Sequence, residues 1–402
     1  MSIYVGTNEI KNVYIWTTPV KEVYVWTTKV RPKSTTFTIS WTEQSNMSSW
    51  WTYSDDAAWL TAGSSAFDDF FWYSAVLLNT SGVKTAEMTQ TWWTFTGAMT
   101  TLGNITSWDN VMIKFPVRWI KMTKSWSTVT LSITDWLGRE SEWYQYYAHC
   151  TWTLSSPWTP KSAFYLWAYK AANNGSNVLK SWSGKTIEVS QTQATSCSRA
   201  SANGTWYNIM WFYQRMYINA LYMMKYWNPD CQSVVGKGYT WASSKTTTWW
   251  TNSQTYATYW TSSNATQCRL FWLEDWWGNA DEWVWWMCTD GSKNLWTALS
   301  WYTWTITTSS PYQNTWTTIQ TTSWFDLSSI AWNNKAMFAT TGTVNNSSYS
   351  TYYCDYVPVN ASSLASAGGS WAGSVYAGAF YLSVTQTAST ASAGLGSRLM
   401  YL

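Results

Sequence analysis

The sequence predicts an α+β protein in which short β-rich modules precede a larger C-terminal domain. A ten-residue repeat in 1–34 indicates small strands, and residues 208–226 have the pattern of one long helix. Three organised blocks close the chain within 353–402. We therefore expect a β-repeat connector in 1–34, a β-rich domain in 35–135 and a larger domain in 136–402.

The composition excludes several classes of function. Charged residues make up only 11% of the 402 residues, against roughly 25% in average soluble proteins. The formal net charge of +3 argues against nucleic acid and anionic membranes as partners. No stretch approaches the roughly 20 apolar residues of a membrane span, so we expect no membrane insertion.

Cysteine and histidine are not arranged for metal or redox chemistry. The six cysteines contain no C-x-x-C pair, and the only histidine, His149, has no partner motif nearby. No G-x-S-x-G, Walker or H-E-x-x-H motif occurs. We expect buried reduced thiols, a structural histidine, no metal, no cofactor and no enzymatic activity.

Tryptophan is the anomaly of the composition. The chain has 38 Trp and 20 Gly, whereas Gly is normally about 7% of residues and Trp is scarce. In the ten-residue repeat, Trp16 and Trp26 stand where the first copy has Gly6. Trp126 and Trp227 stand where a turn and a helix end favour glycine. We hypothesise that many of these positions are glycine in the native protein, encoded by UGA. The alternative is a truly Trp-rich protein that stacks on glycans.

Residues 35–135 are predicted to be β-structure. Runs typical of strands lie at 35–40, 111–115 and 128–134. We expect 113–118 and 128–133 to pair as a hairpin. Adjacent acids at Asp55-Asp56 and Asp68-Asp69 could suggest acid catalysis. Neighbouring residues point different ways on a strand, so we interpret both pairs as solvated loop acids.

The second half of the chain opens with the clearest helix, at 208–226. Apolar residues recur at helical spacing, at Tyr213, Met216, Tyr217, Ala220, Leu221 and Met224. This stripe predicts a helix that faces a core. Asn208 is a suitable N-cap, and the polar positions, such as Arg215 and Lys225, are expected on other faces. Upstream, 164–170 is predicted to be a mostly buried strand.

The last fifty residues alternate between two kinds of sequence. Three blocks combine glycine with large apolar or aromatic residues. They are Gly-Gly-Ser-Trp at 368–371, Ala-Gly-Ala-Phe-Tyr-Leu at 377–382 and Leu-Gly-Ser-Arg-Leu-Met-Tyr-Leu at 395–402. Small and varied polar residues lie between them. Trp276 to Trp283, upstream, contains Trp-Gly-Asn followed by Glu-Trp.

The order of these blocks resembles the C-terminal end of C-type-lectin-like domains on phage tail fibres. The same fold carries the variable proteins of diversity-generating retroelements and is distantly shared with formylglycine-generating enzymes. Residues 273–284 resemble the W-G-N-V-W-E-W segment of this fold, with Ala280 and Asp281 in place of Val and Trp. Four tryptophans fall where these families carry Trp, and are expected to be genuine: Trp206, Trp277, Trp283 and Trp371. Three acids near this segment could in principle bind calcium, namely Glu274, Asp275 and Asp281, but their spacing does not match an EF-hand.

The resemblance implies that 136–402 is a C-type-lectin-like ligand-binding domain. In it the GGSW block and the closing strand build a sheet, and the intervening residues lie on an exposed face. Two tyrosines just before the block join the expected ligand-binding set, because tyrosine is common in binding surfaces. The set is Tyr353, Tyr356, Ala372, Ser374, Val375, Tyr376, Ser383, Thr385, Gln386, Ser389, Thr390 and Ser392. In retroelement-diversified members such positions descend from Asn codons with mutated adenines, a route that reaches every type here except Gln386.

From this resemblance we expect a virion receptor-binding protein of a phage tail fibre, with a variable C-terminal face of the kind that retroelements diversify. Its expected partners are a host cell-surface receptor, either protein or glycan, and other virion tail proteins. The resemblance also implies a homotrimer. Two alternatives remain open: a diversified ligand-binding protein displayed on a cell surface, and a cell-wall glycan-binding protein.

Overall fold

The computed structural model describes most of the chain with its side chains. These residues are 34–44, 51–87, 109–136, 142–150, 160–248, 251, 252, 254, 256–298, 307–309, 312–318, 327–330 and 352–402. Beyond them it describes only the backbone of the short strands in 1–30 and 90–95, of residue 326, and of 331–333 and 336–343. The molecule is a strand-rich α+β structure with several antiparallel sheets, which confirms the predicted mixed class.

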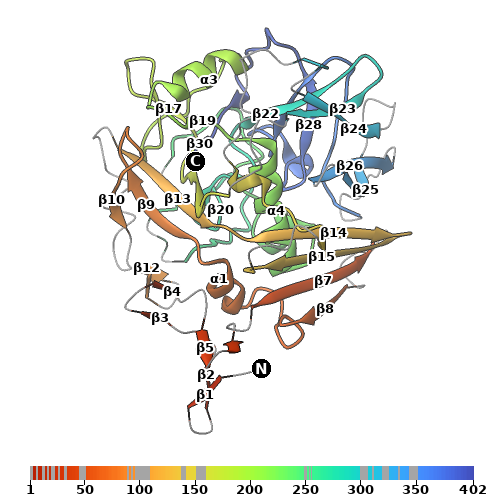
Figure 1. The fold of residues 1–402 in the computed structure, drawn as a ribbon. Helices are drawn as coiled ribbons and strands as arrows, with labels where there is room; N and C mark the ends of the chain where they lie inside the picture. The colour runs from red at the N-terminus through yellow and green to blue at the C-terminus, as the bar shows by residue number, and fades with distance from the viewer. Residues whose placement is uncertain are drawn as a thin grey trace.

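Helix α4 (Phe212–Tyr226) runs through the middle of the molecule (Figure 1). All of its residues up to Lys225 are buried, so its polar side chains face protein and not solvent, in contrast to an ordinary amphipathic helix. The helix begins later than predicted. Asn208 belongs to strand β19 (Tyr207–Ile209), and the N-cap is Trp211, whose backbone N–H donates to Gln214 Oε1 at 3.1 Å.

The C-terminal strand lies inside a six-stranded antiparallel sheet. The strand order is β10 (Lys84–Glu87), β9 (Ser74–Leu78), β13 (Asn110–Pro116), β16 (Ala163–Trp167), β30 (Leu399–Tyr401) and β19. Met400 of β30 stands between Leu166 on one side and Asn208 on the other. The expected domain boundary at residue 135 therefore runs through this sheet, which takes strands from both sides of it.

A second antiparallel sheet has the order β14 (Trp119–Ser125), β15 (Thr128–Thr134), β7 (Thr36–Thr42) and β8 (Trp51–Asp55). The three predicted strand runs are confirmed, but the predicted hairpin of 113–118 with 128–133 is wrong. Strand β14 lies between these runs in sequence and forms a tight hairpin with β15, with Ser125 opposite Thr128. Strand β13 pairs with β9 and β16 instead.

The third large sheet carries the C-terminal blocks. Its order is β24 (Tyr312–Thr318), β23 (Asn294–Ala298), β22 (Asp281–Thr289), β27 (Leu364–Ala367) and β28 (Leu382–Gln386). Strand β29 (Leu395–Gly396) runs parallel to the start of β22. Figure 1 shows this sheet beside α4, with helix α3 (Gln193–Ser201) at the same end of the molecule.

Smaller elements complete the structure. Two-stranded pairs are β17 (Ala172–Asn173) with β18 (Leu179–Lys180), β20 (Arg269–Leu270) with β21 (Leu273–Glu274), β11 (Gln90–Thr91) with β12 (Thr94–Phe95), and β25 (Asp326–Asn333) with β26 (Ala336–Thr343). The N-terminal repeat forms three hairpins: β1 (Ile3–Val5) with β2 (Asn8–Ile10), β3 (Tyr14–Ile15) with β4 (Thr18–Pro19), and β5 (Val23–Val25) with β6 (Thr28–Val30). The predicted small strands of the repeat are thus confirmed, while Trp16 and Trp26 lie outside the described residues.

One pair of acids departs from expectation. Asp55 is exposed, as predicted, but Asp68 is buried in helix α1 (Ser65–Phe71). Both carboxylate oxygens of Asp68 accept hydrogen bonds from Lys225 Nζ at 2.6 Å, and Tyr73 Oη donates to Oδ1 at 2.5 Å. The prediction of a solvated acid is wrong for Asp68, because its cation comes from α4, more than 150 residues away in sequence.

The thiols and the histidine are buried. All six cysteines lie among the described residues, are buried and form no disulfide. His149 is fully buried, with Nε2 at 3.2 Å from the carbonyl oxygens of Phe115 and Pro116. Burial lowers the pKa of His149 to about 3, so the ring is neutral near pH 7. Among the described helices, none is both long and apolar enough to span a membrane.

Candidate functional site

The C-terminal blocks rest on a buried ionic cluster centred on Glu282 of β22. Its Oε1 accepts hydrogen bonds from Lys170 Nζ at 2.7 Å and from Arg398 Nε at 2.9 Å. Arg215 of α4 approaches Oε2 at 3.6 Å. All four side chains are at least 97% buried. Burial alone would raise the pKa of Glu282, but Arg398, Lys170 and Arg215 hold it below its usual value.

The two arginines of this cluster also bind the backbone of the blocks. Arg215 donates to the carbonyl oxygens of Trp276 at 3.0 Å and Ala379 at 3.2 Å. Arg398 donates to the carbonyl oxygens of Trp167 at 2.7 Å and Glu274 at 2.5 Å. Each guanidinium has donors in a planar fork, which suits it to joining several carbonyl groups at once. The cluster therefore ties α4, β22 and the C-terminal strand to one support.

The glycines of the blocks explain why the blocks are close-packed. A Cβ at Gly369, where φ is +77°, would lie 2.5 Å from the Cβ of Ala377. A Cβ at Gly378 would lie 2.0 Å from Asp355 Oδ1, and one at Gly368 would lie 2.9 Å from the carbonyl oxygen of Trp276. Only glycine permits these approaches. The neighbouring GGSW and AGAFYL segments therefore meet the WGN segment, which lies far upstream in the sequence.

Trp-Gly-Asn at 277–279 is joined to the GGSW block by backbone hydrogen bonds. The backbone N–H of Gly278 donates to the carbonyl oxygens of Gly368 and Gly369 at 3.2 and 3.1 Å. The backbone N–H of Trp371 donates to the carbonyl oxygen of Asn279 at 3.3 Å. The indole of Trp277 is buried, and its Nε1 donates to the carbonyl oxygen of Gly236 at 3.0 Å.

The residues that follow GGSW form a loop on the surface. Its backbone is fixed at Ser374, which donates through N to the carbonyl oxygen of Thr240 at 2.7 Å, and at Trp371, which accepts from the N–H of Ala242 at 2.9 Å. Gln232 Nε2 donates to the carbonyl oxygens of Ser374 and Ala377 at 2.8 and 2.7 Å. The loop backbone is thus anchored, while Val375 and Tyr376 have side chains that are 43% and 38% exposed.

A second surface segment follows β28. Thr387 Oγ1 lies 3.1 Å from Ser389 Oγ and 3.0 Å from Thr390 Oγ1, so hydroxyl groups brace this turn. The segment returns to the first loop, because a Cβ at Gly394 would lie 3.3 Å from the Cβ of Ser370. We call 372–376 and 387–393 the display segments. Both leave from and return to the support described above.

The structure divides the predicted ligand-binding residues into three groups. Five side chains are exposed: Ala372, Val375, Tyr376, Ser389 and Ser392. Four are partly exposed: Ser374, Thr385, Gln386 and Thr390. Three are buried: Tyr353, Tyr356 and Ser383. The nine accessible residues lie on the display segments and on the end of β28.

The three buried members have structural contacts. The hydroxyl of Tyr353 donates to Glu43 Oε1 at 2.8 Å and accepts from Trp41 Nε1 at 3.1 Å, so it joins the C-terminal part to β7. Tyr356 packs its ring 5.3 Å from that of Tyr376 and supports the exposed tyrosine. Ser383 lies 2.9 Å from Thr385 through their hydroxyl groups. Successive side chains of a strand point to opposite faces, so about half of the residues in a strand face the core. The sequence alone does not show which half that is.

Two surface residues outside the predicted set lie near the first display segment. Trp241 is exposed, and its neighbour Ala242 bonds the loop backbone. Tyr381 is partly exposed and follows the buried Phe380. The alternation of buried and accessible residues through Phe380, Tyr381 and Leu382 was the signal that could have identified Tyr381. No sequence signal placed Trp241 beside the C-terminus.

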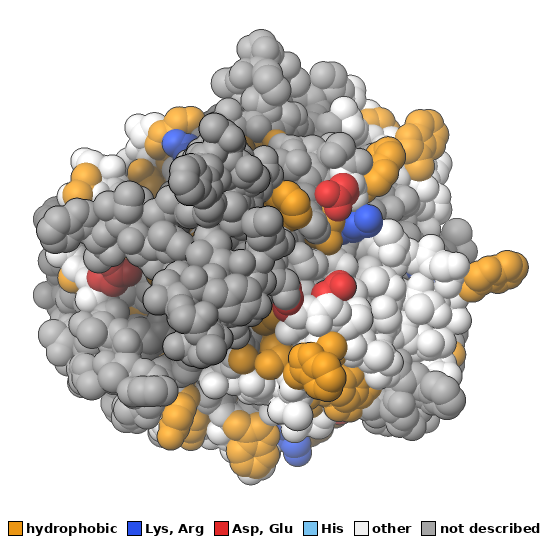
Figure 2. All heavy atoms as spheres, turned by 60° about the horizontal axis from the view of Figure 1, so that its bottom comes forward, with side chains coloured by type: hydrophobic (Ala, Val, Ile, Leu, Met, Phe, Trp, Pro, Cys, Tyr) orange, Lys and Arg blue, Asp and Glu red, His pale blue; other side chains and the backbone are white. Residues whose placement is uncertain are grey.

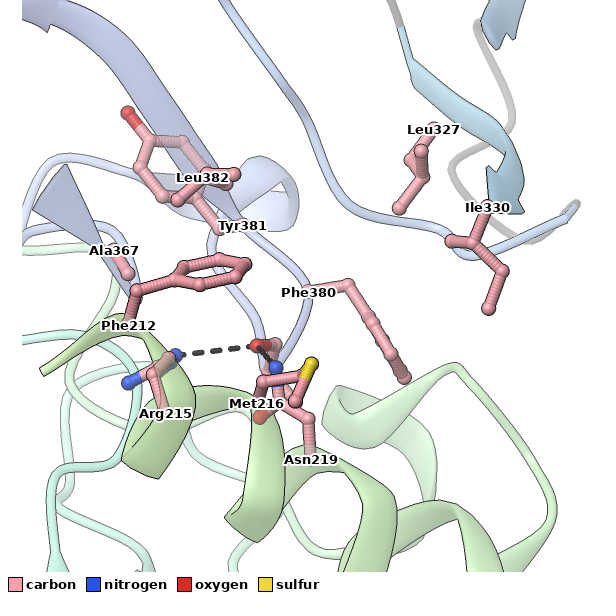
Figure 3. Close-up of a pocket in the computed structure, with 11 residues that line it drawn as sticks. Phe212, Arg215, Met216, Asn219, Leu327, Ile330, Ala367, Phe380, Tyr381 and Leu382 are labelled. Carbon is pink, nitrogen blue, oxygen red and sulfur yellow. Dashed lines mark hydrogen bonds between the residues drawn. The ribbon is translucent and has the colours of Figure 1, made fainter. Parts of the chain in front are cut away.

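The cavity beneath the blocks is a packing gap and not a ligand pocket. It lies between α4 and the strand that leads into β28, and Figure 3 shows Phe212, Met216 and Phe380 around it. Its volume is about 50 Å³, whereas small-molecule sites are typically about 300–1,000 Å³. In Figure 3 the carbonyl oxygen of Ala379 accepts from both Arg215 and Asn219, at 3.2 and 2.8 Å. These bonds hold the backbone that carries the blocks.

The acids near β22 have protein partners. Glu274 Oε2 accepts from the Thr251 hydroxyl at 2.6 Å, and Asp275 Oδ2 accepts from Asn279 Nδ2 at 2.8 Å. Burial, followed by the nearby Glu274, raises the pKa of Asp275 to about 7. Within the described ranges, no group of three or more His, Cys, Asp or Glu side chains is arranged to hold a metal ion.

Comparison with protein-family models gives no match, and comparison with curated proteins gives no significantly similar sequence. The function of the chain is therefore inferred from the geometry of its own residues.

Proposed function

We propose that this chain is a virion receptor-binding protein of the phage tail-fibre kind, with a C-type-lectin-like C-terminal domain. The proposal rests on the contrast between buried and solvent-accessible residues within 368–402. The blocks pack on one another, on Asn279 and on the ionic cluster, whereas most residues between them reach solvent. Side chains on the display segments can therefore differ without disturbing the core, as is usual for binding loops on a rigid scaffold.

The chemistry of the display segments suits recognition by shape and hydrogen bonding. Their exposed side chains are small, hydroxyl-bearing or tyrosine, and the anchored backbone limits the entropy lost when a partner binds. The partner is a host cell-surface receptor, either protein or glycan. A contact made by two short surface segments is weak by itself. We propose a homotrimer in which the binding faces of three copies combine by avidity. The repeat in 1–34 would connect the protein to other virion tail proteins.

Substitutions in the first display segment test the location of the binding face. Labelled protein is incubated with bacterial cells, and the bound fraction is measured as cell fluorescence. Val375→Asp and Tyr376→Ala should each lower binding at least tenfold, while leaving the unfolding midpoint within about 2 °C, because both side chains lie at the surface, outside the core.

Val83→Asp is the matched control. Val83 is 57% exposed and lies between β9 and β10, outside the display segments. Its replacement should leave binding unchanged. Equal binding by the Val375 and Val83 variants would place the receptor site elsewhere.

Two further measurements separate this proposal from other functions. Incubation with purified cell wall should give adsorption without release of soluble fragments, and release would indicate a hydrolase. Light scattering after size-exclusion chromatography should give three times the mass of the chain. A monomeric mass would remove the avidity part of the proposal and leave the binding face to be judged by the cell assay.

A further inference from the structure

The backbone of many tryptophans in this chain has a conformation that belongs to glycine. Eight described tryptophans have φ between +48° and +74°: Trp72, Trp126, Trp143, Trp206, Trp227, Trp272, Trp286 and Trp316. The chain has 27 Tyr and 12 Phe, yet among the described residues only Tyr352 and Phe271 of these types have positive φ. Large side chains clash with the backbone there. The excess is therefore specific to tryptophan and is not shared by aromatic residues in general.

Two of the eight positions end helices. Trp72 follows α1 with φ +53° and ψ +39°, and its N–H donates to the carbonyl oxygen of Asp68 at 2.8 Å. Trp227 follows α4 with φ +48°, and its N–H donates to the carbonyl oxygen of Met223 at 2.8 Å. A left-handed residue that closes a helix in this way is usually glycine.

Two more positions are in hairpin turns of two residues. Trp126 is the first turn residue between the paired Ser125 and Thr128. Trp272 is the second turn residue between the paired Leu270 and Leu273, after Phe271, which also has positive φ. Two-residue hairpins use left-handed residues, and glycine is preferred at these places.

Two others are at strand irregularities. Trp286 lies where the register of β22 with β27 shifts between Val284 and Cys288. Trp316 lies where the register of β23 with β24 shifts. A bulge of this kind commonly places a left-handed glycine in the strand.

The side chains give independent evidence. The exposed fractions are 96% for Trp126, 85% for Trp316, 72% for Trp143 and 52% for Trp72. Rings with this degree of exposure leave more than half of their surface in water. On the face drawn in Figure 2, some hydrophobic side chains project from the surface.

Another set of tryptophans differs from the first in backbone conformation, although Trp272 and Trp286 of the first set are fully buried as well. Trp41, Trp276, Trp277 and Trp283 are buried, have no positive φ, and donate through Nε1 to a protein acceptor at 3.0–3.1 Å. A buried indole with its N–H satisfied is the environment in which Trp is stable. Trp277 and Trp283 were expected to be genuine, and they fall in this set. Trp206 was also expected to be genuine, but its φ of +74° places it with the other group.

We infer that the protein made in its native host carries glycine at positions 72, 126, 143, 206, 227, 272, 286 and 316, and tryptophan at 41, 276, 277 and 283. One difference in decoding accounts for both groups. If UGA is read as glycine in the host and as tryptophan in the printed sequence, the first group has UGA codons and the second has UGG. The N-terminal repeat agrees, since its first copy has Gly6 where the later copies have Trp16 and Trp26.

The gene and the native protein test the inference together. Cleavage after Arg269 and Lys293 releases one peptide, 270–293, that contains members of both groups. We expect UGA at codons 272 and 286 and UGG at 276, 277 and 283. Mass spectrometry of this peptide from native particles should find glycine at the UGA positions and tryptophan at the others.

Three results would overturn the inference. They are UGG at all eight positions, UGA spread equally over both groups, or tryptophan in the native peptide at UGA codons. A stability comparison supplies a second test. Recombinant chain with glycine at the four exposed positions, 72, 126, 143 and 316, should unfold roughly 5 °C or more above the chain as printed, because these changes relieve a left-handed backbone without removing a buried ring. Glycine at 41, 276, 277 and 283 should lower the midpoint of thermal unfolding. If both variants lowered the midpoint equally, the division of the tryptophans into two groups would be wrong.

Discussion

Replacing Glu282 by Gln should destabilise the protein far more than neutralising an acid in a surface ion pair. The substitution keeps the size of the side chain but removes the negative charge that three buried cations share. Lys170 and Arg398 lie at 2.7 and 2.8 Å from Oε1, and Arg215 lies at 3.6 Å from Oε2. Breaking a buried ion pair by neutralising one partner typically costs about 3–5 kcal/mol. We expect a loss in this range in the free energy of unfolding.

Equilibrium unfolding in urea, followed by fluorescence and circular dichroism, measures this loss. Glu188→Gln is the matched control, since Glu188 pairs with Arg199 at the same 2.7 Å but both side chains are about one-fifth exposed. Exposed pairs contribute about 0–1 kcal/mol, so the control should remain close to the native protein. The double variant Glu282→Gln with Lys170→Met should lose less than the sum of the two single variants, because it leaves one fewer unpaired cation.

A small effect would refute this reasoning. If Glu282→Gln lowered the free energy of unfolding by no more than Glu188→Gln does, the cluster would not hold the blocks together. The pH dependence has a defined sign. Folding lowers the pKa of Glu282, so the ionised carboxylate stabilises the folded protein at pH values above the ordinary pKa of glutamate. This stabilisation is lost as the pH falls. The native protein should therefore lose more stability than the Gln variant as the pH falls below about 4.5.

Other substitutions have equally definite outcomes. The raised pKa of Asp275, about 7, favours the protonated form in the folded state, so its contribution to stability is lost as the pH rises from about 4 to 7. The stability of Asp275→Asn relative to the native protein should therefore be higher at pH 8 than at pH 4. Thermal melts at the two pH values measure this difference, and the absence of such a trend would contradict the burial argument. Gly378→Ala should cost at least about 2 kcal/mol, because its Cβ would lie 2.0 Å from Asp355 Oδ1. Gly291→Ala, with no atom within 4 Å of the added Cβ, should change the denaturant midpoint little, and equal effects of the two alanines would refute the packing argument.

Local patterns in the sequence predicted the elements of this protein well. The strand runs at 35–40, 111–115 and 128–134, the helix that ends at Tyr226 and the N-terminal repeat strands are all present. These elements follow from side-chain periodicity and from turn residues, which act over a few positions. The unusual placement of Trp126 and Trp227 was visible for the same reason, because a turn and a helix end are local features.

Pairing between distant segments could not be predicted in this way. The hairpin assigned to 113–118 and 128–133 was wrong, because many antiparallel pairings satisfy the same alternation and only the whole sheet selects one. Asp68 is similar. Its sequence neighbours suggest a loop acid, and its burial depends on Lys225, which α4 brings to it.

Local sequence patterns are sufficient to predict the mixed α+β class, the positions of the C-terminal blocks and the places where the backbone turns. Each of these depends on residues near one another in the chain. The tertiary structure decided which predicted binding residues reach solvent: Tyr376 does, whereas Tyr353 is held inside by Glu43 and Trp41. It also assembled the cluster around Glu282 from Lys170, Arg215 and Arg398. Buried charges are stable only when their partners converge, and convergence across more than 200 residues is a property of the folded chain alone.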